Sequence, residues 1–185
     1  MENIKKQELY VTIPHKRVAV LIGKGGADKK NIEELSQAKL DIDSGSGEVT
    51  LIRNEADAFT FYRLEKVVKA VGRGFSPEHA KLLLESEYSL DIINITDFGI
   101  NSSRAKETKR GRVIGAKGAV RKFIEDALDC FVSVEGKTVA IVGKLPEILW
   151  AKDAVISLLE GSTIPAVRKQ IQNKIVKSHS QAEWE

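Results

Sequence analysis

Two glycine-rich blocks contain the residue types and spacing best suited to recognition chemistry in this sequence of 185 residues. Residues 22–33 and 114–125 are identical at seven of twelve positions, at an offset of 92 residues. Each block places a Gly-x-x-Gly tetrad ahead of a Lys-Lys or Arg-Lys pair. Glycine tolerates positive φ angles and lets a foreign backbone come close, and a loop that opens a helix directs free N–H groups outward. The pattern predicts a grip on a chain of phosphates.

The distribution of charge supports this prediction, although the formal net charge is only +3. Residues 15–30 contain five Lys or Arg and one Asp, a net +4, and residues 104–122 contain eight and one Glu, a net +7. The rest of the chain therefore has a net charge of −8. Clustered positive charge is typical of a polyanion site, and the alternative is a solvated Lys-rich face. One tetrad could be only a tight turn, but two copies favour nucleic-acid binding.

The elements around each block follow one order: strand, short helix, Gly-x-x-Gly, helix, strand, strand, helix. The strand assignments rest on alternating apolar residues and the helix assignments on apolar spacings of three or four. In the first half the expected strands are 9–13, 40–43 and 49–52, and the helix that follows has Asn54 as its N-cap and its apolar face within 61–71. In the second half the strands are 90–95, 132–135 and 139–142, and the helix has Pro146 in its first turn, apolar residues within 149–159 and its end at Gly161. This order predicts an α+β fold in which each unit packs a three-stranded sheet on helices.

The expected domain boundary follows Gly72-Arg73-Gly74. The first domain is residues 1–74 and the second is residues 75–185, which includes a leading helix from Ser76-Pro77 and an extra C-terminal helix from about residue 163. The tail from Ser178 is expected to be loose.

The shared core Ile-Gly-x-x-Gly-x-x-x-Lys-x-Ile resembles the KH domain in both halves. Two strands and a helix follow each glycine block, an order that favours type I (βααββα) over type II. In KH domains the loop clamps about four nucleotides of backbone, and an aliphatic groove holds the bases. Lys29 and Arg121 stand where the usual core has an aliphatic residue. Ile114, Ile124 and Val132 would suit either that groove or the core.

Three further stretches, residues 72–80, 109–115 and 136–143, make the chain similar to one family, the tandem-KH small-subunit ribosome assembly factors. Eukaryotic members are called Partner of NOB one, and their first KH unit has lost its Gly-x-x-Gly. Because Gly23 and Gly26 are kept and the long eukaryotic N-terminal extension is absent, the chain resembles the archaeal members. The resemblance implies binding near the 3′ end of small-subunit rRNA and cooperation with the endonuclease that trims it.

Residues for catalysis or metal binding are expected to be absent. One Cys and three scattered His offer no metal cluster. Gly136-Lys137-Thr138 has the ending of a P-loop, but Phe131 occupies the position of the required glycine. No signal peptide and no membrane span are apparent. We therefore expect a non-enzymatic, soluble, cytoplasmic protein without cofactor or metal.

The second unit is expected to bind RNA more strongly, because its surroundings have a charge of +7 against +4. One alternative is a scaffold in which one KH unit docks a nuclease or a translation initiation factor, and another is a general single-stranded nucleic-acid binder. The residues assigned to RNA binding are Arg110, Arg112, Ile114, Gly115, Ala116, Lys117, Gly118, Arg121 and Lys122 in the second unit, and Arg17, Ile22, Gly23, Lys24, Gly25, Gly26, Lys29 and Lys30 in the first.

Overall fold

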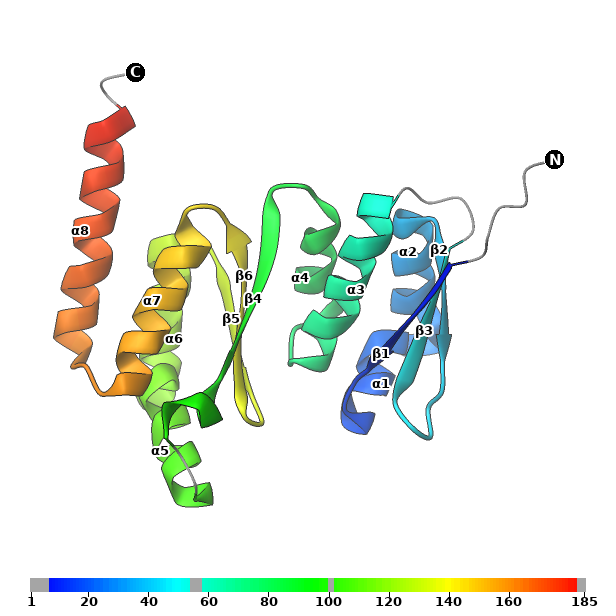
Figure 1. The fold of residues 1–185 in the computed structure, drawn as a ribbon, viewed down its shortest axis with the longest axis horizontal. Coiled ribbons are helices and arrows are strands. Elements are labelled where there is room, and N and C mark those ends of the chain that lie inside the picture. The colour runs from blue at the N-terminus through cyan, green and yellow to red at the C-terminus, as the bar shows by residue number, and fades with distance from the viewer. Residues whose placement is uncertain (1–6, 54–57, 100–101, 183–185) are drawn as a thin grey trace. The chain divides into compact units, whose positions relative to one another are not determined.

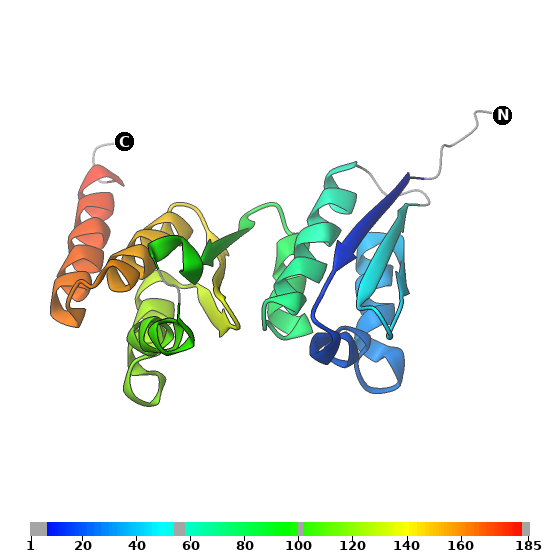
Figure 2. The ribbon, with the colours of Figure 1, turned by 60° about the horizontal axis from the view of Figure 1, so that its bottom comes forward.

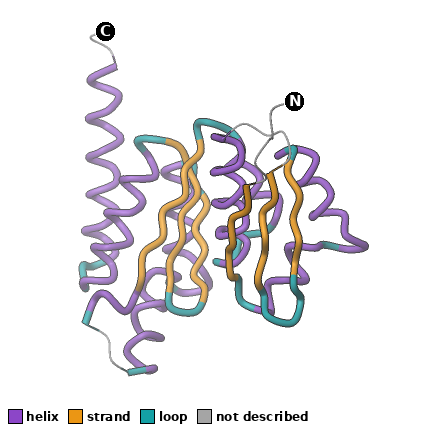
Figure 3. Tube along the Cα trace, turned by 45° about the vertical axis from the view of Figure 1, so that its right-hand side comes forward, coloured by secondary structure: helices purple, strands orange, loops and turns teal. Residues whose placement is uncertain are grey.

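The chain forms two compact units, residues 1–90 and 91–185. The computed structural model describes residues 7–53, 58–99 and 102–182 (Figure 1). Both units contain a three-stranded sheet with helices on one of its faces (Figure 3). None of the helices in the described ranges has the length and apolar character that a bilayer span requires.

The first unit follows the predicted order of elements. These are β1 (Gln7–Thr12), α1 (His15–Ile22), a 3₁₀ turn η1 (Lys24–Gly26), α2 (Ala27–Ser36), β2 (Ala38–Ile42), β3 (Glu48–Arg53) and α3 (Ala58–Gly72). The antiparallel sheet has the order β1-β3-β2, and Leu51 in the central strand lies opposite Leu9 and Leu40. Val49 and Leu51 are buried as the alternating pattern requires.

The second unit repeats this order with a longer helix before its glycine loop. Its elements are β4 (Tyr88–Asn94), η3 (Ile95–Phe98), α5 (Ser103–Ile114), η4 (Ala116–Gly118), α6 (Ala119–Leu128), β5 (Phe131–Glu135), β6 (Thr138–Lys144) and α7 (Glu147–Glu160). The strand order is β4-β6-β5. Helix α5 starts where the Ser102 side chain accepts the Ala105 N–H at 3.2 Å. The predicted α+β fold of two repeated units is therefore confirmed.

Each core lies between the sheet and the helices that cover it. In the first unit α3 buries the four apolar residues that predicted it, Phe61, Leu64, Val68 and Val71. Its predicted N-cap, Asn54, lies outside the described residues. In the second unit Ile93, Val132 and Ile141 of the sheet form one cluster with Val113, Ile124 and Val155 of the helices. Leu149 was expected on an apolar helix face, but its side chain is 49% exposed. Ile148, one residue earlier, is buried in its place.

Each unit is completed by an accessory helical segment packed on its last helix. In the first unit, α4 (Pro77–Lys81) and a 3₁₀ turn η2 (Leu82–Leu84) pack on α3, with Ala80 and Leu83 buried. In the second, α8 (Ile164–Ala182) packs on α7, with Val167 and Ile171 buried. The helix expected to lead the second domain thus lies in the first unit, and the division falls at residues 90 and 91 instead of 74 and 75. Helix α8 also extends through Ser178, where a loose tail was expected.

Candidate nucleic-acid interface

The two Gly-x-x-Gly loops have nearly the same backbone conformation. The first glycines, Gly23 and Gly115, have φ angles of 72° and 73°, and the last, Gly26 and Gly118, have 81° and 80°. The same hydrogen bonds close both loops: Gly26 N–H donates to the Gly23 carbonyl at 3.2 Å, and Gly118 N–H donates to that of Gly115 at 3.2 Å. In Figure 2 each loop projects from its own unit as an open turn. Seven shared identities have therefore produced two copies of one local structure.

The first and last glycines of each loop are needed for different reasons. A Cβ on Gly115 would lie 2.4 Å from Val120 Cγ2 and 2.8 Å from the Val120 amide nitrogen, so the close packing of the next helix requires glycine there. A Cβ on Gly118 or Gly26 would meet nothing within 4 Å. These last glycines are needed only for their left-handed φ angle. The space beside them is open to a ligand.

Each loop presents an uncapped helix N-terminus. The N-cap residues are glycines, Gly26 and Gly118, so neither α2 nor α6 has a hydrogen bond from its first amides to an N-cap side chain. The first N–H groups of a helix have no partner within the helix, and together with the dipole they attract anions. The two middle residues of each tetrad, Lys24 and Gly25 or Ala116 and Lys117, are exposed. Phosphate oxygens could therefore reach both the amides and the lysine.

Lys117 differs from its counterpart Gly25 in one physical respect. Both residues have left-handed backbones, with φ angles of 51° and 62°. Glycine adopts this conformation at no steric cost, whereas another residue pays about 1 kcal/mol or more. The second unit therefore holds a lysine at the tip of the loop in a conformation that favours glycine. The added charge comes at a cost in folding stability.

The cations assigned to RNA binding divide into exposed and engaged groups. Lys24 and Lys30 in the first unit, and Arg112, Lys117 and Lys122 in the second, are exposed and make no hydrogen bond or ion pair with residues 7–53, 58–99 and 102–182. Arg110 is half-buried, and its Nε is buried without a hydrogen-bond partner in those ranges. The free cations that surround the second loop thus come from both helices that flank it.

Arg17 serves the fold of the first unit. Its Nε donates to the Val71 carbonyl at 2.8 Å, and its Nη2 donates to the Phe75 carbonyl. These carbonyls lie at and just beyond the C-terminal end of α3, where orphan acceptors and the negative end of the dipole favour a cation. The guanidinium that counted toward the +4 of the first block is therefore directed to the helix end. Lys109 does the same in the second unit, where its Nζ donates to the Leu159 carbonyl near the end of α7.

The glutamate at the end of each repeat block has a structural role that the sequence analysis did not identify. Glu33 Oε1 accepts the Leu40 N–H at 2.8 Å, and Glu125 Oε1 accepts the Val132 N–H at 2.8 Å. Each glutamate also faces the basic residue one helical turn before it, Lys29 at 4.0 Å and Arg121 at 3.6 Å. The occurrence of the same glutamate at the end of both repeat blocks was the sequence feature that could have indicated this role. Lys29 and Arg121 are thus partly neutralised, unlike Lys30 and Lys122.

One acidic side chain distinguishes the first loop from the second. A Cβ on Gly23 would lie 2.2 Å from an Asp28 carboxylate oxygen, so this carboxylate packs against the loop. The equivalent residue of the second unit is Val120, which is buried. Asp28 lies in the first turn of α2, where a negative charge is favourable to the helix. It lowers the positive potential of the first loop, and the second loop has no carboxylate at the equivalent position.

The apolar candidates also separate into two groups. Ile124 and Val132 are buried core residues. Ile22 and Ile114, the last residues of the helices before the loops, are only half-buried. Ile114 is therefore partly exposed beside the second loop, whereas Ile124 and Val132 belong to the core. No group of three His, Cys, Asp or Glu side chains could hold a metal ion within the described ranges.

Comparison with protein-family models gives two matches. Residues 89–176 match a model described as "Eukaryotic type KH-domain (KH-domain type I)", and residues 8–58 match a model described as "KH domain". A curated KH domain-containing protein of Methanocaldococcus jannaschii is 42% identical over 153 residues, which is 82% of this chain. The matched segment spans 66% of that relative's length.

Three solved structures resemble the chain over both units. Dim2p of Pyrococcus horikoshii is 44% identical, with 90% of this chain and 99% of that chain covered and a TM-score of 0.85. A chain from the a/eIF2alpha–aDim2p–rRNA complex of the same organism is 43% identical, with coverages of 94% and 96% and a TM-score of 0.87. A protein of unknown function from Aeropyrum pernix is 27% identical, with coverages of 97% and 97% and a TM-score of 0.88. This chain belongs to the family of tandem type I KH proteins that includes the archaeal Dim2p.

Proposed function

We propose that this chain binds single-stranded RNA through the Gly-x-x-Gly loop of its second unit, near the 3′ end of small-subunit rRNA during maturation of the 30S subunit. The observation that supports this function best is the α5–α6 loop. There an open glycine, an uncapped helix N-terminus and exposed cations lie within a few residues of one another. The role is binding, and the loop needs no catalytic group to account for its residues.

The geometry suggests how RNA is held. Phosphates approach over Gly118, where a Cβ would have met nothing, and accept hydrogen bonds from the first amides of α6. Lys117 and Lys122 neutralise the same phosphates, and Arg112 adds charge from the last turn of α5. Ile114 contacts a base beside the loop. This division follows the general mode of KH domains, in which the loop holds the backbone and an aliphatic surface holds the bases.

The ribosomal target is supported by the described relatives. The aDim2p chain that is 43% identical to this one was solved in a complex with rRNA and a/eIF2alpha. The cation arrangement alone would serve any single strand, since phosphates contribute no sequence information. A general single-stranded nucleic-acid binder is therefore the alternative against which the rRNA assignment must be measured.

The direct test replaces Ala116 and Lys117 with Asp in the full chain. Affinity for a single-stranded RNA with the small-subunit 3′-end sequence should fall by about two orders of magnitude, because three units of charge change at the phosphate contact. Unchanged thermal unfolding would show that the fold is intact, and unchanged affinity would refute the proposal. Competition with an unrelated single strand of equal length tests the target, and equal competition would favour the general binder.

A second role, docking of a protein on the first unit, is favoured by a different observation. Two aromatic side chains one turn apart on α3, Phe59 and Tyr62, are 75% and 58% exposed. Exposed aromatics are typical of binding surfaces, and the Asp28 carboxylate beside the first loop disfavours RNA there. The relative solved with rRNA was also in complex with a translation factor. If Phe59→Ser with Tyr62→Ser abolishes binding of purified a/eIF2alpha and leaves RNA affinity unchanged, the first unit is a protein-docking unit; retained binding excludes this surface.

A further inference from the structure

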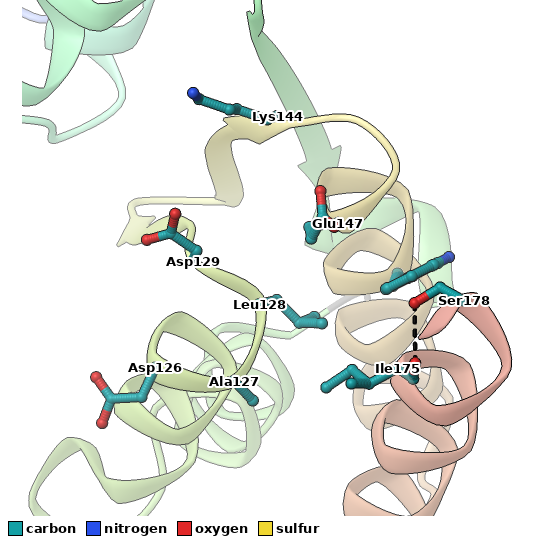
Figure 4. A pocket seen from close by; sticks show the side chains of 9 residues that line it. Asp126, Ala127, Leu128, Asp129, Lys144, Glu147, Ile175 and Ser178 are labelled. Carbon is teal, nitrogen blue, oxygen red and sulfur yellow. Dashed lines mark hydrogen bonds between the residues drawn. The ribbon is translucent and has the colours of Figure 1, made fainter. Parts of the chain in front are cut away.

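The second unit has a pocket at the end of α6 opposite the Gly-x-x-Gly loop. Its volume is about 470 Å³, within the usual range of binding pockets. It is lined by the last residues of α6, Lys144 at the end of β6, Glu147 and Trp150 of α7, and Ile175 and Ser178 of α8. In Figure 4 Leu128 and Ile175 extend from α6 and α8 into the space between these helices, with Glu147 nearby at the start of α7. The pocket thus combines an apolar floor with polar edges.

The charge around this pocket is opposite to that of the loop. Three carboxylates, those of Asp126, Asp129 and Glu147, line it together with one lysine, Lys144. The C-terminal end of α6 adds the negative end of its dipole to this set. A nucleic acid would be repelled here, and a cationic side chain would be attracted. The two ends of α6 therefore favour ligands of opposite charge.

Three large apolar side chains that adjoin lining residues in the sequence are exposed. Leu145 and Leu149, next to Lys144 and Trp150, are 61% and 49% exposed, and Val176, next to Ile175, is 66% exposed. Exposed large apolar groups are typical of a surface that a partner covers. The long helix α8 forms one wall, and its Arg168 stacks on the Phe123 ring of α6 at 4.6 Å. Helix α8, one wall of the pocket, therefore packs on α6, the helix that follows the proposed RNA-binding loop.

The first unit has a smaller pocket between α2 and its own accessory segment. Its volume is about 340 Å³, and it lies between Leu35 of α2 and the segment α4–η2. Leu35 corresponds to Ala127 at the repeat offset of 92. The second unit thus has a smaller side chain in its pocket lining than the first unit has at the equivalent position.

We infer that this pocket docks a segment of a partner protein in which a Lys or Arg stands beside aliphatic residues. The aliphatic side chains would lie against the apolar lining of Ala127, Trp150 and Ile175, and the cation would face Asp126, Asp129 and Glu147. The site lies on the same unit as the proposed RNA contact but at the other end of α6. Protein and RNA could therefore be bound by one unit at the same time.

The test uses displayed random 12-residue peptides selected against the full chain. Enriched peptides should contain a basic residue beside aliphatic ones. They should bind at least tenfold more weakly to Asp126→Lys with Glu147→Lys, and several-fold more weakly to Ala127→Leu, which fills the pocket without a charge change. The control, Asp41→Lys with Asp97→Lys, makes the same charge change at two exposed positions outside the pocket and should bind as the wild type does.

Three results would overturn the inference: no enriched sequence, enriched peptides that bind the pocket variants as tightly as the wild type, or sedimentation showing that the pocket variants abolish a dimer of this chain. RNA affinity should stay within twofold in every pocket variant. A loss of RNA binding by Ala116→Asp with Lys117→Asp leaves this test unaffected, so the two proposals fail separately.

Discussion

The two Gly-x-x-Gly loops share a backbone and differ in the side chains around it. Their φ angles agree within about 11° at each of the three left-handed positions, and the same hydrogen bonds close them. Around the first loop, Arg17 is bound to the end of α3 and Asp28 packs against Gly23. Around the second, a lysine occupies the tip and a valine replaces the aspartate. Glycine spacing thus determines the shape of the loop, and a few neighbouring side chains determine its charge.

The largest expected effect separates the two glycines within the second loop. Gly115→Ala should lower the free energy of unfolding by about 3 kcal/mol, because it adds a clash with Val120 to the cost of a left-handed alanine. Gly118→Ala has the same φ cost but open space, so its loss should be only about 1 kcal/mol. Urea denaturation measures both. Equal losses would show that packing on α6 does not require the first glycine.

The next effect separates structural from ligand-binding arginines. Arg17→Ala should destabilise the chain by about 2 kcal/mol, because two charge-assisted hydrogen bonds to the end of α3 are lost. Its RNA affinity should change little. Arg112→Ala should do the opposite, with weaker RNA binding and an unchanged unfolding midpoint. If Arg17→Ala weakens RNA binding more than Arg112→Ala does, the assignment of the two residues is wrong.

Asp28 and Val120 are equivalent residues that differ between the two loops. Exchanging them tests whether this difference gives the loops different electrostatic potentials. Val120→Asp should weaken RNA binding about tenfold, since it places a carboxylate against the phosphate site. Asp28→Val should strengthen binding by the first unit, measured in a chain that also has Ala116→Asp and Lys117→Asp. Filter-binding titrations at one fixed salt concentration suffice. No change in either variant would mean that position 28 or 120 has no influence on the loop potential.

A smaller effect concerns the strained lysine. Lys117→Gly should raise stability by about 1 kcal/mol, because glycine tolerates the left-handed backbone. It should also reduce the log–log salt slope of RNA affinity by about 0.7, because one phosphate fewer is neutralised. The substitution is thus expected to stabilise the fold and to weaken the binding of phosphate. A stability gain with an unaltered salt slope would show that Lys117 does not bind the RNA.

The smallest effect is the pH dependence contributed by Cys130. Burial raises the pKa of its thiol to about 12, and Glu125, Asp129 and Glu147 add to the shift. The unfolded thiol ionises near pH 9, so the stabilising contribution is complete below that pH and is lost as the pH rises toward 12. Cys130→Ala should remove this part of the alkaline loss of stability. In the native state iodoacetamide should label Cys130 far more slowly than in urea, and equal rates would show that the thiol is accessible.

The sequence predicted the order of elements and the loops because both depend on local patterns. Alternating strands, helical spacings and the repeat of seven identities are independent of distant contacts. Long-range contacts account for what was missed. The hydrogen bond from Arg17 to Val71 spans 54 residues, and α4 belongs to the first unit because Ala80 and Leu83 are buried there. Leu149 was missed for the same reason. Helical spacing identifies apolar residues, but only the packing of neighbouring elements determines which of them are buried.

One paired measurement tests the central claim that two copies of one loop have been given different charges and different roles. Ala116→Asp with Lys117→Asp, and Lys24→Asp with Gly25→Asp, each change the charge by −3 at equivalent loop positions. Binding to the same single-stranded RNA should fall about a hundredfold for the first pair and less than about threefold for the second. Equal losses from the two pairs, or a larger loss from the first unit, would contradict the account.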